Sequence, residues 1–90
     1  MSDINRIAAT NVTNTSVTLL NSSTPKLIKT ILMGNGLETD QNLSLMIDNI
    51  QFMFTVPASS TLIIDNPIVC SNISGSATSM IGVHITGMNL

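Results

Sequence analysis

The protein is a chain of 90 residues, of which 43% are hydrophobic and 9% are charged, with a formal net charge of −2. Its three basic residues, Arg6, Lys26 and Lys29, cannot form the extended patch that neutralises a series of phosphates, so nucleic acid is not an expected partner. The apolar runs are interrupted by turn residues well before the roughly 18 positions of a membrane-spanning helix, so no membrane partner is expected either.

Short segments rich in Val, Ile, Thr and Phe recur along the chain between Asn, Gly, Ser and Pro, which is the pattern of an all-β domain. The expected strands are, in chain order, residues 4–12, 15–20, 26–33, 42–47, 50–56, 61–65, 68–71 and 79–86. The first is weakly patterned, so we expect an N-terminal arm or edge strand over residues 1–14 and a sandwich domain over residues 15–90. Seven or eight strands at this spacing predict a small antiparallel β-sandwich of jelly-roll-like form, with a partly open barrel as the alternative.

The alternation of side chains assigns the second and third segments to faces. In residues 15–20, Leu19 is expected to point into the core and Leu20 out of it. Residues 26–33 carry apolar side chains on both faces, with Ile28 on the outer one. A strand of this kind is expected to be covered on two sides.

Two short stretches predict the main turns. Gly34, Asn35 and Gly36 tolerate positive φ, so a bend is expected where the third segment ends. Asp48 and Asn49 predict a compact turn between the fourth and fifth segments.

The later segments show a clear period of two. In residues 50–56 the alternation places Phe52 and Phe54 together in the core. The stretch "SNISGSATS" over residues 71–79 is expected to be a Ser/Gly-rich loop or an irregular edge. The last segment is expected to point Ile81, Val83 and Ile85 to one face.

Nothing in the sequence forms a catalytic, metal or cofactor site. Cys70, the single cysteine, is expected to be a small buried hydrophobic residue, and His84, the single histidine, a packed or interface residue. The five carboxylates are scattered and give no set of metal ligands. Without Trp or Tyr, the chain also has few aromatic platforms for sugars or bases. We therefore expect the protein not to be an enzyme and to use no cofactor.

Several apolar side chains fall on faces that the alternation points outward, more than one small sandwich can hide. They are Leu20, Ile28, Leu32, Met46, Met53, Ile63 and Met80. We expect other copies of the chain, in a homo-oligomer such as a closed ring or trimer, or a larger scaffold, to cover them. The alternative is that they are ordinary exposed hydrophobic residues, or that β-bulges shift the face assignment.

Three stretches, "TPKLIKTILMGN", "VPASSTLIIDNPIVC" and "VHITGMNL", resemble a pattern of small β-sandwich virion proteins of tailed bacteriophages. The matching positions, all with structural roles, are Ile28, Asn35, Pro57, Leu62, Pro67 and Gly87. The resemblance implies a capsid decoration protein that packs symmetrically, stabilises the capsid and has phage structural proteins as partners. It also implies a location in the virion after assembly in the host cytoplasm. The alternatives are a tail or head-to-tail component, or a small receptor- or carbohydrate-binding module.

Overall fold

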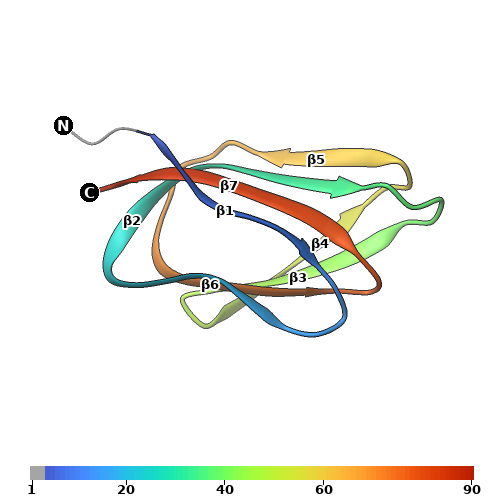
Figure 1. Cartoon of the computed structure of the whole chain (residues 1–90), viewed down its shortest axis with the longest axis horizontal. Helices are drawn as coiled ribbons and strands as arrows, with labels where there is room; N and C mark the ends of the chain where they lie inside the picture. The colour runs from blue at the N-terminus through green and yellow to red at the C-terminus, as the bar shows by residue number, and fades with distance from the viewer. Residues whose placement is uncertain (1–3) are drawn as a thin grey trace.

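The computed structural model describes residues 4–90, and in this part of the chain the alternating segments form seven strands (Figure 1). They are β1 (Asn5–Val12), β2 (Val17–Asn35), β3 (Gln41–Ile47), β4 (Ile50–Val56), β5 (Ser60–Ile64), β6 (Ile68–Ala77) and β7 (Ile81–Asn89). Every pairing between them is antiparallel, within a single hydrogen-bonded sheet. The prediction of a small antiparallel β-sandwich is confirmed.

This sheet folds over on itself, because β2 and β6 each take part in two layers. Residues 26–35 of β2 pair with β7 and β5, and β7 pairs with β1. We call this set, in the order β5-β2-β7-β1, layer A. Residues 17–21 of β2 pair with β6, which continues through β3 to β4, and the set β2-β6-β3-β4 is layer B.

The bend that carries β2 from one layer to the other lies at residues 22–25. There the pairing with β6 skips from Asn21 to Lys26. Pro25 lies in this gap, and because proline has no N–H it cannot donate a hydrogen bond to the ladder. Figure 1 shows the bend at the end of the molecule where β1 begins and β7 ends.

The expectation of a loop over residues 71–79 is wrong, because β6 continues to Ala77. Cys70 pairs with Lys26 and Asn72 with Asn21, so β6 changes layers beside the bend of β2. Its second half is then held by β2 on one side and β3 on the other. Small Ser and Gly residues are accommodated here because two neighbouring strands satisfy the backbone hydrogen bonds.

The core lies between the two layers and is built from residues at alternate positions. The last strand buries the face that carries Ile81, Val83 and Ile85, and β3 likewise buries alternate residues. The buried apolar residues are Val12, Leu19, Leu20, Ile28, Ile31, Met33, Leu43, Leu45, Ile47, Val56, Cys70, Ile73, Ala77, Ile81, Val83 and Ile85. Burying a large aliphatic side chain contributes roughly 1.5–3 kcal/mol relative to exposure, so this cluster is the main source of stability.

Two bulges correct the face assignment of β2. The register with β6 shifts between Thr18 and Leu20, so that Leu19 and Leu20 are both buried. The register with β7 shifts between Ile28 and Thr30, which places Ile28 in the core. An extra residue in one strand reverses the alternation after it, so the outward assignment of Leu20 and Ile28 is wrong.

The turn between β3 and β4 is the compact turn that the sequence predicts. Asp48 and Asn49 have φ values of 50° and 67°, as the two central residues of a type I′ hairpin require. The Asp48 carboxylate accepts hydrogen bonds from the backbone N–H groups of Ser71 at 2.9 Å and Asn72 at 3.1 Å. The turn is thereby fixed to β6 at the point where that strand changes layers.

β2 ends at Asn35, within the stretch where the sequence predicts a bend, but without positive φ values there. No glycine among the described residues has a positive φ, and Asn35 is also outside that region and is buried. Its side-chain Nδ2 donates to the carbonyl oxygens of Thr39 at 2.9 Å, Val56 at 3.0 Å and Pro57 at 3.2 Å. Its Oδ1 accepts from the N–H of Leu37 at 2.9 Å. Asn35 therefore joins three segments of backbone where the strands of both layers end.

Candidate interaction surfaces

The two layers close on each other along one side of the sandwich and leave an apolar groove along the other. On the closed side, Ala77 N–H donates to the carbonyl oxygen of Thr13 at 2.7 Å, and Val12 is fully buried. On the other side, β4 is the outermost strand of layer B and β5 that of layer A. Between them lies the apolar groove, with a volume of about 480 Å³, lined by Ile31, Ile47, Phe52, Phe54, Ile64, Asn66 and Ile68.

β4 is exposed to an extent that its alternation did not predict. Phe54 is half-buried, but Phe52 is 45% exposed and Ile50 is 60% exposed. The prediction that both phenylalanines lie in the core is therefore wrong for Phe52. The reason is that β4 is an edge strand, and the strand across the groove, β5, has only five residues with which to cover it. We define the open side as the apolar groove together with Ile50.

The outer face of layer A is the second apolar surface. Leu27 pairs with Val69 on one side and Met88 on the other, and Leu32 pairs in the same way with Ile63 and His84. Val69 and Ile63 are more than half exposed, whereas the other members are half-buried. The two rows, which we call the layer A outer face, are Val69-Leu27-Met88 and Ile63-Leu32-His84.

His84 has a polar atom without a partner in the second of these rows. Its Nδ1 is buried and makes no hydrogen bond, the only such side-chain atom in residues 4–90. A buried polar atom of this kind costs free energy unless a donor or acceptor reaches it.

The structure separates the seven predicted interface residues into three groups. Leu20 and Ile28 belong to the core of the subunit, and Leu32 and Met46 are half-buried. The exposed members are Met53, Ile63 and Met80. The prediction missed Ile50, Phe52 and Val69, which are exposed because of their position at sheet edges; the sequence shows their hydrophobicity but not that position.

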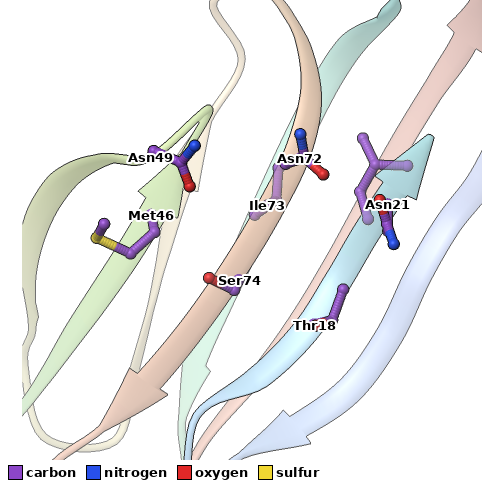
Figure 2. Close-up of a pocket in the computed structure, with 8 residues that line it drawn as sticks. Thr18, Asn21, Met46, Asn49, Asn72, Ile73 and Ser74 are labelled. Carbon is purple, nitrogen blue, oxygen red and sulfur yellow. The ribbon is translucent and has the colours of Figure 1, made fainter. Parts of the chain in front are cut away.

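A small polar hollow lies on the outer face of layer B (Figure 2). It has a volume of about 200 Å³ and is lined by Thr18, Leu20, Asn21, Met46, Asn49, Asn72, Ile73 and Ser74. Asn21 and Asn72 are cross-strand partners, while Asn49 comes from the turn after β3. Figure 2 shows the three side-chain amides around the hollow. It offers neutral hydrogen-bonding groups and no charged side chain.

The described residues do not assemble a reactive site. No group of three or more His, Cys, Asp or Glu side chains within residues 4–90 could hold a metal ion. Cys70 is buried, as predicted, and burial together with the nearby Asp48 charge raises the pKa of its thiol. A protonated, buried thiol is a poor nucleophile. In the part of the chain that the structure describes, no helix has the length and apolar character to cross a membrane.

Comparison with known proteins gives a likeness in fold. No family model matches the sequence, and no curated protein matches it. The structure matches the crystal structure of Drosophila NLP-core, described in terms of pentamer formation and histone binding, with a TM-score of 0.62 and 21% sequence identity. The match covers 96% of this chain and 99% of the fly chain. The fold is nucleoplasmin-like.

This match overturns the interpretation of the chain as a tailed-phage virion protein. The assignments to capsid decoration, a tail or head-to-tail part, or a receptor- or carbohydrate-binding module are wrong, as are the virion location and the phage partners. The stretches that carried the resemblance are short strands between turns, which any small sandwich contains. The interpretation that the chain is not an enzyme agrees with the match, because the fly protein is described by assembly and binding.

Proposed function

We propose that the chain is a self-associating, nucleoplasmin-like core that forms a ring of five copies and binds a basic protein partner of the histone kind. The observation that carries the proposal is the open side, where β4 presents Ile50 and Phe52 beside the apolar groove. An edge strand with exposed apolar side chains is a surface that soluble monomers avoid. The likeness to a protein described by pentamer formation supports the number five.

The charge distribution favours contact between copies. β4 contains no charged residue, and the whole chain has only eight Lys, Arg, Asp and Glu residues. Each Å² of apolar area removed from water stabilises an association by roughly 25 cal/mol. Because β4 is uncharged, few charged groups lose their hydration when this strand is covered, so little of that stabilisation is offset. Self-association through the open side is therefore favoured over exposure of β4 to water.

Light scattering coupled to size-exclusion chromatography tests the assembly. The wild-type chain is expected to elute at five times 9.5 kDa, about 48 kDa, because a closed ring fixes the copy number. Phe52→Lys places a charge in the open side and is expected to yield monomer. The matched control is Thr18→Lys, an exposed strand residue of layer B three strands away from β4, which is expected to assemble normally. A monomeric wild-type chain at micromolar concentration would contradict the proposal.

An excess of acidic residues supports a basic partner. The chain has five Asp and Glu against three Lys and Arg, and its isoelectric point is about 4.7. Asp40 and Asp48 accept backbone hydrogen bonds, which leaves Glu38 and Asp65, in exposed loops, as the other carboxylates of residues 4–90. A ring of five copies repeats these two carboxylates five times, which increases the attraction to a cationic protein.

Fluorescence anisotropy with labelled core histones tests this second part. Binding is expected at low salt and is expected to weaken as ionic strength rises, because exposed charges are screened. The double variant Glu38→Gln, Asp65→Asn should bind more weakly while remaining assembled. If the wild-type ring does not bind histones at low salt, the histone part of the proposal fails and the assembly part is unaffected.

A further inference from the structure

We propose that assembly joins the open side of one copy to the layer A outer face of the next copy. The inference rests on the proposed self-association and adds which two surfaces meet. A closed ring of more than two copies requires a head-to-tail contact between two different patches of each chain. The open side supplies one patch, and a second, separate patch must cover it.

The layer A outer face is the surface whose composition fits the second patch. Its two rows consist of Val69-Leu27-Met88 and Ile63-Leu32-His84, five aliphatic or thioether side chains and one imidazole. The corresponding cross-strand row of layer B is polar at three of four positions, running from Gln51 through Met46 and Ser74 to Thr18. Apolar surface is thus concentrated on one outer face of the sandwich and at the open side.

The charges on the two surfaces are compatible with their meeting. The strands of layer A, over residues 5–12, 26–35, 60–64 and 81–89, contain no Asp or Glu. β4 is uncharged as well, so this contact would bury no carboxylate from either strand set and would bring no like charges together. The basic residues of these strands are Arg6, Lys26 and Lys29, and their charged ends can remain at the rim.

A local feature of layer A also leaves space for a neighbour at this position. Beside the His84 row, Gly34 and Gly82 are cross-strand partners. An added Cβ at Gly34 would meet nothing closer than 3.9 Å, so no side chain of the subunit covers the sheet at Gly34 and a neighbour has room to approach there.

The area available is sufficient for a stable contact. The molecule measures 42 × 21 × 18 Å, so each of its long sides covers roughly 750–900 Å². A specific interface of standard size buries about 800 Å² on each partner. One outer face of the sandwich can supply this area while leaving layer B and the loops free for another partner.

A complementation experiment tests the pairing of surfaces. Phe52→Lys breaks the open side and leaves the layer A outer face intact, whereas Val69→Lys breaks the layer A outer face and leaves the open side intact. Each variant alone is expected to be a monomer of 9.5 kDa. An equimolar mixture has one intact contact, so light scattering should show a 1:1 complex of about twice that mass and nothing larger.

Controls separate this inference from the proposed function. Ile63→Lys repeats the test at a second exposed position of the layer A outer face, and circular dichroism checks that each variant keeps its β-sheet signal. Thr18→Lys on layer B should not complement or disrupt anything. The pairing of surfaces is wrong if the wild type assembles and both Val69→Lys and Ile63→Lys assemble equally well. It is also wrong if the wild type assembles and the mixture of Phe52→Lys and Val69→Lys stays monomeric. In either case the proposed self-association stands. A monomeric wild type overturns both.

Discussion

Replacing Asn35 with alanine should destabilise the subunit more than any exposed asparagine replacement. The amide makes four contacts with backbone groups, at 2.9, 3.0 and 3.2 Å from Nδ2 and 2.9 Å to Oδ1. The two N–H hydrogens and the one acceptor oxygen of the amide count as three hydrogen bonds, each worth about 1 kcal/mol net. Removing them should therefore lower the free energy of unfolding by about 3 kcal/mol. A domain of this size has a total stability of roughly 5–13 kcal/mol, so the loss is a large fraction of the whole.

Urea denaturation followed by circular dichroism, at one fixed protein concentration, measures this loss. With a slope of about 1–1.5 kcal/mol per M, the midpoint should fall by about 2–3 M. The matched control is Asn42→Ala, because Asn42 is exposed and its side chain accepts one hydrogen bond, from Thr55 at 2.9 Å. The control should lose about 1 kcal/mol or less. If Asn35→Ala loses less than the control, the amide does not hold the strand ends together.

Three further predictions follow from contacts inside the subunit. An added Cβ at Gly87 would lie 2.3 Å from the carbonyl oxygen of Leu27, so Gly87→Ala should lower the free energy of unfolding by about 2–3 kcal/mol or more, measured by thermal denaturation. The control is Gly36→Ala, which should change stability little because an added Cβ there meets nothing within 4 Å. Asp48→Ala removes two hydrogen bonds to β6 and places alanine at a φ of 50°, so the free energy of unfolding should fall by about 2–3 kcal/mol. Asp48→Asn should lose clearly less, and equal losses in the two variants would contradict the role of the turn. The pKa of the Cys70 thiol is raised in the folded state, so at alkaline pH the folded chain retains a proton that the unfolded chain releases. The free energy of unfolding should therefore fall as pH rises above about 8.5. Cys70→Ala should lack this pH-dependent component, and identical pH profiles of the wild type and the variant would refute it.

The two apolar surfaces were only partly predictable. The excess of outward-facing apolar residues is visible in the sequence, and Met53 and Ile63 are indeed exposed. Their grouping was not visible, because cross-strand neighbours such as Ile63 and Leu32 are distant in the chain and meet only through pairing. Phe52 shows the same limitation, since its exposure depends on the short strand across the groove.

Several properties of this protein are determined by the sequence itself. The alternation of apolar and polar residues predicts an antiparallel sandwich, because side chains of an extended backbone point to opposite faces at successive positions. The Asp48-Asn49 turn is equally local, because both residues tolerate positive φ. The scarcity of charge and of reactive residues depends on composition alone.

Tertiary structure decides which face each side chain finally occupies. A bulge exists only relative to a partner strand, and the two bulges in β2 bury Leu20 and Ile28 against the local alternation. The passage of β2 and β6 between layers likewise depends on where their hydrogen bonds find partners, and it separates a closed side from an open one. The two apolar surfaces arise from this pairing, because register is a property of two strands together and cannot be read from either strand alone.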